Sequence, residues 1–329
     1  MRIFASYMKV DLFIVYLLLS VVLAYFFPGM AMYQEGLPLH TVTTIGVSLI
    51  FFFYGLKMSL AEIKRGLRNW RLHLLVQSIT FLVFPLLILA FRPFIHTHLQ
   101  EQFWLSFFFL AALPSTVSSS VVMVAIARGN LSAAIFNASL SGLIAVIITP
   151  LWMSMFLSFE STASFSEVYW GLIKEIIIPI ILGLLLQRYW GSWAKKYTKA
   201  LSNFDKTVIL MIVYMSFAES FSNGIFQQIS NMYLLGVFAG VIVLFVMVYG
   251  LVGLISGKLG FNREDRIVAL FCGSKKSLTH GSVFGKLLFA NSASAGLYFL
   301  PLMLYHAFQI FVITFIAQQY GKESREKER

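Results

Sequence analysis

Apolar stretches long enough to cross a lipid bilayer recur along almost the whole chain, and this repetition constrains the fold more than any other feature. A helix that spans the hydrocarbon layer needs about 20 predominantly apolar residues. Such stretches fall at 11–28, 40–60, 71–91, 103–128, 131–158, 168–190, 206–223, 232–256, 265–289 and 293–318. Because the connections are short and polar, the sequence predicts an all-α integral membrane protein of about ten transmembrane helices, without a separate soluble domain.

Composition excludes several other classes of protein. Only 12% of the 329 residues are charged, whereas a soluble domain carries about 25% charged residues, so a large soluble core is disfavoured. The first stretch follows Arg2 and Lys9 and could be a signal peptide, but no convincing small-residue cleavage site comes after it. The single cysteine, Cys272, excludes an internal disulfide and a multi-cysteine metal site.

The net charge of +11 is interpreted as a topology signal and not as a nucleic-acid footprint. Basic residues gather after the second, sixth and eighth apolar stretches and at the end of the chain, whereas the alternate connections hold mainly glutamates, with Arg92 and Lys286 as exceptions. The basic residues are Lys57, Lys64, Arg65, Arg68, Arg71, Arg188, Lys195, Lys196, Lys199, Lys206, Lys258, Arg263, Arg266, Lys322, Arg325, Lys327 and Arg329. Since basic connections stay on the cytoplasmic side, we expect both termini in the cytoplasm, with a bacterial inner membrane as the location.

Two polar segments interrupt the apolar pattern at corresponding places. One runs from Leu113 to Ser120, and the other from Cys272 to Ser277, about 160 residues later. Each precedes a similar run of small residues, at 130–134 and 291–295. An offset of five spans inverts the membrane orientation, so the pattern predicts two inverted five-helix repeats, at 1–160 and 161–320, followed by a charged cytoplasmic tail at 321–329. A chance alignment of two polar kinks is the alternative.

Helix-breaking residues in these segments predict a polar centre inside the bilayer. Pro114 lacks an amide proton and Gly273 lowers the cost of unwinding, so both free backbone groups that must line a cavity or be buried in protein. Half-helix ends that meet near the midplane would attract ions or a charged solute. The hydroxyl and amide side chains there are candidate ion or solute ligands, although such residues often only join membrane helices. The candidates are Ser115, Thr116, Ser118, Ser119, Ser120, Asn137, Ser141, Ser274 and Ser277.

Charged and titratable residues strengthen this interpretation. Lys275 and Lys276 are the sharpest signal, because a cation at the membrane centre costs at least about 2.5–3.5 kcal/mol on insertion scales; one of them could instead extend to an interface. His280 lies one turn after Lys276 on the same face and could titrate near neutral pH, although a helix–helix contact is the simpler role. Gln77 and Glu219 are further polar candidates, and Glu219 could lie in water near the outer boundary. Lys174 and Glu175 are interpreted as structural residues near that boundary.

With these residues in view, the chain resembles the bile acid:sodium symporter family, solute carrier family 10, most closely the divergent branch of its seventh human member and bacterial homologues. The resemblance covers essentially the whole chain and is most specific at four segments: Phe51–Leu56, Leu113–Ser120, Ala127–Asn130 and Phe271–Leu278. It implies two inverted repeats in which helices four and nine are unwound and cross. It also implies a panel domain from spans 1, 2, 6 and 7 and a core domain from spans 3–5 and 8–10.

The resemblance also assigns ion-site positions, some of which depart from the family pattern. Gln77, Ser119 and Ser120 fall on sodium-binding positions, and Na⁺ at Ser119, Ser120 and Asn137 is one possibility. However, the ninth-helix carboxylate of the family aligns with Phe271, its glutamine with Lys275, and its fifth-helix hydroxyls fall near Ala134 and Ala138.

A lysine at such a position changes the expected coupling. Two unit charges about 4 Å apart repel by about 4 kcal/mol at an effective dielectric near 20, which weakens sodium binding roughly a thousandfold. We therefore expect Lys275 to occupy the place of one sodium ion, held by Gln77 and unwound carbonyls. Alternatively, the lysine carries a coupling proton.

Together, these features favour secondary active transport of a small, anionic organic solute by alternating access, with sodium coupling altered or absent and Na⁺ or H⁺ as the coupling ion. The alternative is a regulatory membrane protein of ion homeostasis without transport of its own. An enzyme is disfavoured, because no His-Glu-x-x-His, paired Asp or Gly-x-Ser-x-Gly pattern occurs. The expected partners are the solute and the lipid bilayer; bile acids do not follow from a shared fold, and the oligomeric state is left open.

Overall fold

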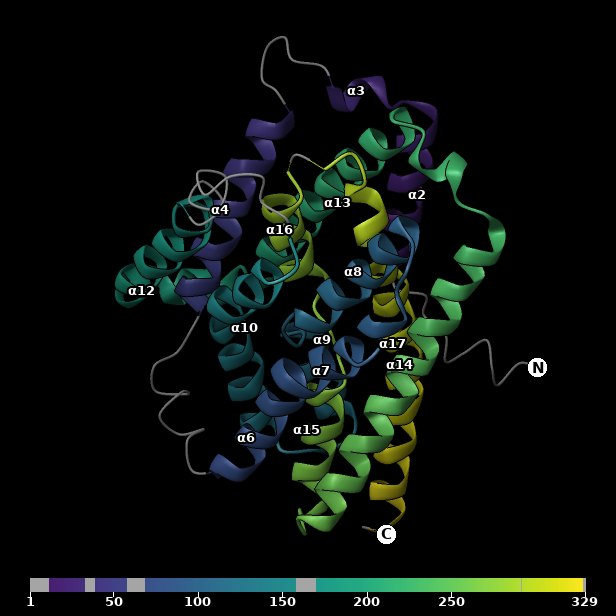
Figure 1. Cartoon of the computed structure of the whole chain (residues 1–329). Coiled ribbons are helices and arrows are strands. Elements are labelled where there is room, and N and C mark those ends of the chain that lie inside the picture. The colour runs from purple at the N-terminus through teal and green to yellow at the C-terminus, as the bar shows by residue number, and fades with distance from the viewer. Residues whose placement is uncertain (1–11, 33–38, 58–68, 158–169, 291, 328–329) are drawn as a thin grey trace, which may run out of the picture.

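The computed structural model describes residues 12–32, 39–57, 69–157, 170–290 and 292–327, and within these ranges every regular element is a helix (Figure 1). The first half contains α2 (Leu12–Phe26), α3 (Gly29–Met32), α4 (Leu39–Lys57), α6 (Trp70–Ser78), η2 (Ile79–Val83), α7 (Phe84–Leu89), η3 (Arg92–Phe94), α8 (His98–Ala112), α9 (Ser118–Ile126) and α10 (Leu131–Ser154). The second half contains η4 (Ile173–Ile177), α12 (Ile178–Lys196), α13 (Thr198–Ser222), η5 (Ile225–Gln228), α14 (Asn231–Lys258), α15 (Arg263–Gly273), α16 (Leu278–Leu288) and α17 (Ala295–Lys327).

Seven helices among the described residues are long and apolar enough to cross a membrane, so the prediction of an all-α, multi-pass membrane protein is confirmed. They are Leu39–Lys57, Trp70–Phe94, Leu131–Ser154, Trp170–Lys196, Thr198–Ser222, Asn231–Lys258 and Ala295–Ser324. The other three predicted spans correspond to the shorter α2 and to two interrupted pairs, α8 with α9 and α15 with α16. Ten crossings and the inverted repeat stay predictions.

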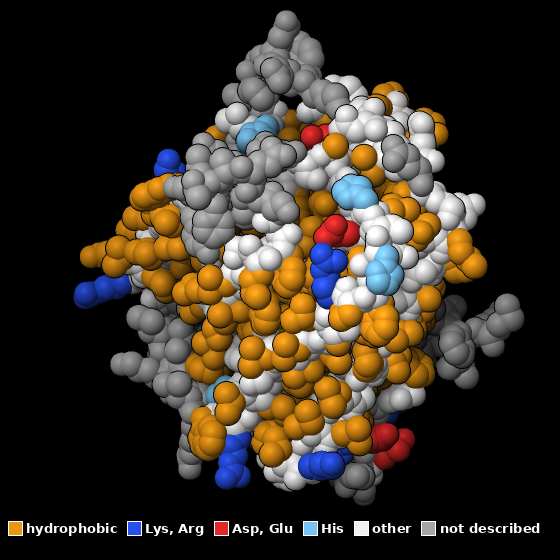
Figure 2. All heavy atoms as spheres, in the orientation of Figure 1, with side chains coloured by type: hydrophobic (Ala, Val, Ile, Leu, Met, Phe, Trp, Pro, Cys, Tyr) orange, Lys and Arg blue, Asp and Glu red, His pale blue; other side chains and the backbone are white. Residues whose placement is uncertain are grey.

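Hydrophobic side chains cover most of the face shown in Figure 2, and charged side chains are sparse on it. Large apolar residues such as Leu185, Val243 and Phe311 are more than half exposed. In water such a surface would aggregate, whereas in a bilayer it is the side of the protein that contacts lipid. The exposed apolar surface therefore agrees with the membrane assignment.

Close backbone packing joins α4 to α12, which lie side by side in Figure 1. Gly55 and Gly183 face each other at this contact, and a Cβ atom on Gly183 would collide with the carbonyl oxygen of Phe52. Small residues allow membrane helices to approach closely. α2, α3, α4 and η4 belong to the same group of packed helices through α12 and α13.

A second group of packed helices contains the two interrupted pairs. α8 packs on α17 and α7, α14 packs on α15 and α17, and α10 contacts α6, α8, α9 and α15. α13 also packs against α16 and α17, so it connects the two groups. Below, these are called the α4 group and the α10 group.

Proline and local capping explain the two interruptions. Leu113 is extended, with φ −75° and ψ 155°, because the residue before a proline is disfavoured in the α region. Pro114 then cannot donate a helical hydrogen bond, and the next helix, α9, begins at Ser118. In the other pair, α15 ends at Gly273 and α16 begins after Ser277, whose side chain caps it. Both predicted breaks are thus present.

Candidate functional site

The two interruptions meet in the interior of the helix bundle. The backbone N–H of Ser277 donates a hydrogen bond to the carbonyl oxygen of Pro114 at 2.9 Å. Tyr305 on α17 donates its hydroxyl proton to the carbonyl oxygen of Ser274 at 2.7 Å. Pro114, Ser274 and Ser277 are all buried. Protein groups therefore satisfy part of the backbone that the breaks free, as a low-dielectric interior requires.

The ammonium group of Lys276 lies in a cage of backbone carbonyls. Its Nζ atom donates hydrogen bonds to the carbonyl oxygens of Thr80 at 2.8 Å, Ala111 at 2.6 Å and Leu113 at 2.7 Å. Nζ also lies 4.0 Å from the centroid of the Phe84 ring, within range of a cation–π interaction. An ammonium has three donors, so these carbonyls saturate it. Such a set of neutral oxygens is also a suitable environment for a monovalent metal cation.

The sequence explains why these carbonyls are free. Ala111 and Leu113 lie at the C-terminal end of α8, where carbonyls lack helical partners and the helix dipole is negative. Thr80 belongs to the π-helical turn η2, in which the N–H of Phe84 bonds to the carbonyl of Ile79, five residues earlier. The corresponding partner of Thr80 would be Pro85, which has no N–H.

The adjacent Lys275 has a different environment, and the expectation that Gln77 and unwound carbonyls hold it is wrong. Its Nζ atom donates to the hydroxyl of Ser119 at 2.7 Å. Successive residues of an unwound segment point in different directions, which explains why the carbonyl cage holds Lys276 and not Lys275.

A chain of hydroxyl groups continues from Ser119. Ser119 donates to Thr116 Oγ1 at 2.9 Å, and Thr116 and Ser120 share a hydrogen bond of 2.7 Å. Ser120 Oγ lies 3.4 Å from the carbonyl oxygen of Phe271, the position at which the family resemblance places a carboxylate. The hydroxyls of the fourth-span break are thus joined to α15. Ser118 begins α9, but its side chain lies outside the described residues.

A second polar network joins α6 to α10. The Nε2 atom of Gln77 lies 3.2 Å from the backbone oxygen and 3.3 Å from Oδ1 of Asn137. One turn further along α10, the Ser141 hydroxyl accepts a hydrogen bond from the Ser115 N–H at 3.0 Å. Gln77 Oε1 and Ser115 Oγ are buried and have no hydrogen-bond partner within the described ranges. These two oxygens could bind an ion or a solute.

The three predicted sodium ligands lie in different networks of the structure. Ser119 and Ser120 belong to the hydroxyl chain, whereas Asn137 bonds to Gln77. Sodium binding by Ser119, Ser120 and Asn137 stays a prediction.

His280 lies in the first turn of α16 and packs against α4. The Ser277 hydroxyl accepts from its backbone N–H at 3.2 Å and lies 3.0 Å from its Nδ1 atom. The imidazole packs edge-on against Phe51 and Tyr54, each at 5.8 Å between ring centroids. The Tyr54 hydroxyl donates to the carbonyl oxygen of Ser139 on α10 at 2.8 Å. These contacts connect the α4 and α10 groups.

Two predicted residues lie elsewhere in the fold. Glu219 is half-buried near the end of α13, and among the described residues it shares no hydrogen bond with the two networks at the breaks. Glu175, interpreted from the sequence as structural, forms an ion pair with Lys286.

Residues that the sequence analysis did not single out complete the site. Gln309 on α17 is fully buried, and its amide accepts from the N–H and donates to the carbonyl of Lys276, both at 2.8 Å. Tyr305, Thr80 and Phe84 are likewise contacts of the second break. Gln309 could have been predicted from the sequence, because a polar side chain within the last apolar stretch is as unusual as Gln77 within the third.

Buried helix breaks, a lysine in a carbonyl cage and a lipid-compatible surface are the features of a polytopic membrane transporter. Comparison with known proteins leads to the same class. The model of the SBF-like CPA transporter family matches residues 11–322, and the chain belongs to this family.

Several relatives match along most of the chain. An uncharacterized protein of Pseudomonas aeruginosa is 37% identical over 95% of this chain and 93% of its own length. Sodium/bile acid cotransporter 7 of Mus musculus is 30% identical over 83% of this chain and 81% of its own length. Sodium/bile acid cotransporter 7-B of Xenopus laevis is 29% identical over 93% of this chain and 90% of its own length.

Proposed function

We propose that this chain is a secondary active transporter of a small, anionic organic solute, with sodium coupling altered or absent because a lysine of the chain takes the place of a coupling ion. The observation that carries the proposal is the Lys276 ammonium, held by the three carbonyl oxygens of Thr80, Ala111 and Leu113. Because the Lys276 ammonium already occupies the carbonyl cage, a sodium ion from solution is not required at this position.

The architecture of the proposed transporter is ten crossings, with the α4 group as the panel and the α10 group as the core. The interrupted pairs supply two of the crossings, and α2 supplies a third beside the seven long helices. Alternating access would move the two groups relative to each other. The polar contacts of Tyr54 and Lys286 lie where such motion would occur.

An anionic solute suits the charge at the first break. Lys275 donates to Ser119, the second residue of α9. A helix N-terminus carries a partial positive charge, so an ammonium beside it is an unfavourable pair until an anion binds near both. Two buried oxygens without partners among the described residues, on Gln77 and Ser115, are available to bind polar groups of the solute or one cation.

Uptake into proteoliposomes tests the proposal directly. A library of radiolabelled organic anions is offered while sodium and proton gradients are imposed separately. We expect accumulation of at least one anion that a sodium gradient does not increase. No flux of any anion, or a strict dependence on sodium, would contradict the proposed function.

Substitutions of Lys276 test whether this lysine takes the place of a sodium ion, and the test does not require that the solute be known. In Lys276→Ala the carbonyls remain and the space of the side chain opens, so NaCl, but not choline chloride, is expected to raise the melting temperature. Lys276→Met is the matched control, because its side chain fills the space without a charge, and it should show no specific response to sodium. Equal responses of both variants would argue against a cation site in the cage.

A further inference from the structure

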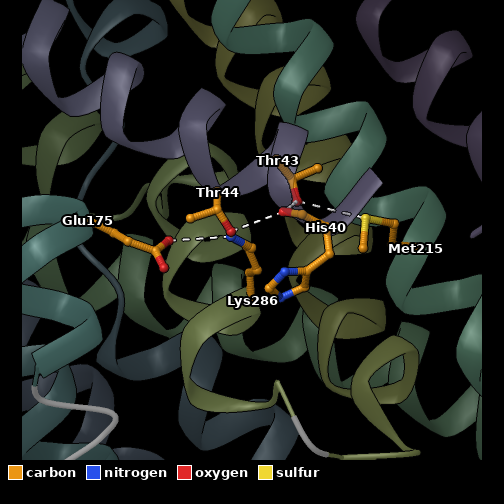
Figure 3. Close-up of polar contacts among 6 residues, drawn as sticks. All are labelled: His40, Thr43, Thr44, Glu175, Met215 and Lys286. Carbon is orange, nitrogen blue, oxygen red and sulfur yellow. Dashed lines mark hydrogen bonds and ion pairs between the residues drawn. The ribbon is translucent and has the colours of Figure 1, made fainter. Parts of the chain in front are cut away.

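A third lysine with a largely buried side chain lies at the boundary between the two helix groups, away from the breaks. Lys286, on α16 of the α10 group, contacts Thr44 of α4 and Glu175 of η4, both in the α4 group (Figure 3). Its Nζ atom lies 2.5 Å from the Thr44 hydroxyl oxygen and 3.3 Å from Glu175 Oε2. The side chains of Lys286 and Glu175 are only 9% and 17% exposed. This charge pair therefore joins the two groups.

The Lys286–Glu175 pair lies near the first turns of α4, at one end of the boundary between the two groups. Thr44 is in the second turn of α4, and its hydroxyl also donates to the carbonyl oxygen of His40, an exposed residue. Deeper along the same boundary, His280 of α16 packs on Phe51. Lys286 follows His280 by six residues, about 9 Å along a helix. In the proposed orientation, Lys286 lies on the outer side, and His280 lies between it and the breaks.

Separation of the two groups would leave this ammonium without its carboxylate. Removing one partner of a buried ion pair is strongly destabilising, because the remaining charge is desolvated and uncompensated. An incoming anion can replace the carboxylate at the same ammonium. Lys286 also has three N–H donors, and Thr44 and Glu175 are its two acceptors among the described residues. Within the described part of the chain, one donor is thus available for another oxygen.

We propose that Lys286 and Thr44 form an entry site for the anionic group of the solute, and that Glu175 is an internal carboxylate that occupies this site between transport cycles. The inference rests on the proposed function, anion transport between the two helix groups. The ligand class is an organic monoanion with carboxylate-like oxygens. Binding exchanges one ion pair for another: the solute takes the place of Glu175 and loosens the contact between the groups.

The proposal predicts competition between Glu175 and added anions. A tethered carboxylate acts at a high effective concentration, so the wild-type protein should bind a small anion weakly. Glu175→Gln removes the competing charge and leaves the ammonium. Benzoate is the probe, and benzamide, which has the same shape without the charge, is its control.

The experiment measures the melting temperature of the purified full-length protein against benzoate concentration. We expect the half-saturating benzoate concentration to fall at least tenfold in Glu175→Gln, with no response to benzamide. Adding Lys286→Met to this variant should abolish the response, whereas Lys286→Arg should keep it. Glu101→Gln is the matched control, because it breaks a different ion pair, with Arg92 at 2.7 Å, and should leave the wild-type response unchanged.

An equal benzoate response in wild type, Glu175→Gln and the double variant would overturn the proposal. So would a Glu175→Gln variant that is less stable but does not respond to benzoate, because the pair would then only hold the fold. If the double variant Glu175→Gln with Lys286→Met does not fold, Glu175→Gln combined with Thr44→Val takes its place. Its half-saturating benzoate concentration should be several-fold higher than that of Glu175→Gln alone. Since binding in detergent needs no transport, a failure of this site is distinguishable from the absence of flux in proteoliposomes.

Discussion

Two neighbouring lysines with the same chemistry have different environments in this molecule. The Lys276 ammonium is saturated by carbonyl oxygens, and its backbone is bound to Gln309. Lys275 has one described acceptor, the Ser119 hydroxyl. A saturated buried cation contributes to the fold, whereas a cation with free donors remains able to bind another group. We therefore expect Lys276 to be a structural charge and Lys275 to be the one that is available for binding.

Replacing the two lysines separately should reveal this division. Lys276→Met leaves three buried carbonyls unpaired, each costing about 1–3 kcal/mol, so we expect the melting temperature to fall by more than about 5 °C. Lys275→Met should change the melting temperature by less than about 2 °C but reduce anion uptake at least about tenfold. Thermal unfolding and proteoliposome uptake measure the two effects. Equal destabilisation by both substitutions would contradict the division.

At the scale of the elements, the breaks could be predicted from the sequence, but the partners of the side chains could not. Pro114 and Gly273 mark backbone that cannot stay helical, and the structure shows interruptions at both. The carbonyl cage depends on the π turn before Pro85, and no residue of 79–83 shows that turn by itself. Which lysine enters the cage depends on the path of four unwound residues, a tertiary property.

Contact between α4 and α12 depends on glycine at positions 55 and 183. Gly183→Ala would bring a methyl group against the carbonyl oxygen of Phe52, so the helices must separate. We expect a lower melting temperature and a smaller yield of monodisperse protein. Gly250→Ala on α14 is the control, because a methyl group there would meet nothing within 4 Å and alanine is the better helix former. Equal behaviour of the two variants would show that the close approach is dispensable.

At the scale of the whole molecule, the apolar repetition predicted the membrane fold, because the hydrocarbon thickness fixes the length of a crossing helix. The same rule cannot identify a crossing made of two short helices, such as α8 and α9, unless the break between them is recognised. The predicted orientation depends on the positions of the basic residues, since the arrangement of the helices alone does not show which side of the membrane is cytoplasmic.

Cysteine labelling tests the predicted orientation. Asn223, which follows α13, and Lys258, the last residue of α14, are both exposed, and the whole of α14 lies between them in the chain. A membrane-impermeant maleimide should label Asn223→Cys in intact cells and should label Lys258→Cys only after permeabilisation. Native Cys272 is buried and can stay in both variants. The reverse labelling pattern would place the termini outside.

A tethered cation has an electrical consequence. Sodium ions that accompany an anion enter with it and carry positive charge down the membrane potential, whereas the ammonium of Lys276 never leaves the protein. A monoanion moved without a companion cation would pay about 2.3 kcal/mol for each 100 mV of negative interior potential. At that voltage the equilibrium lies roughly fiftyfold toward the exterior, so accumulation of the solute in an energised cell requires that another ion, such as a proton, travel with it.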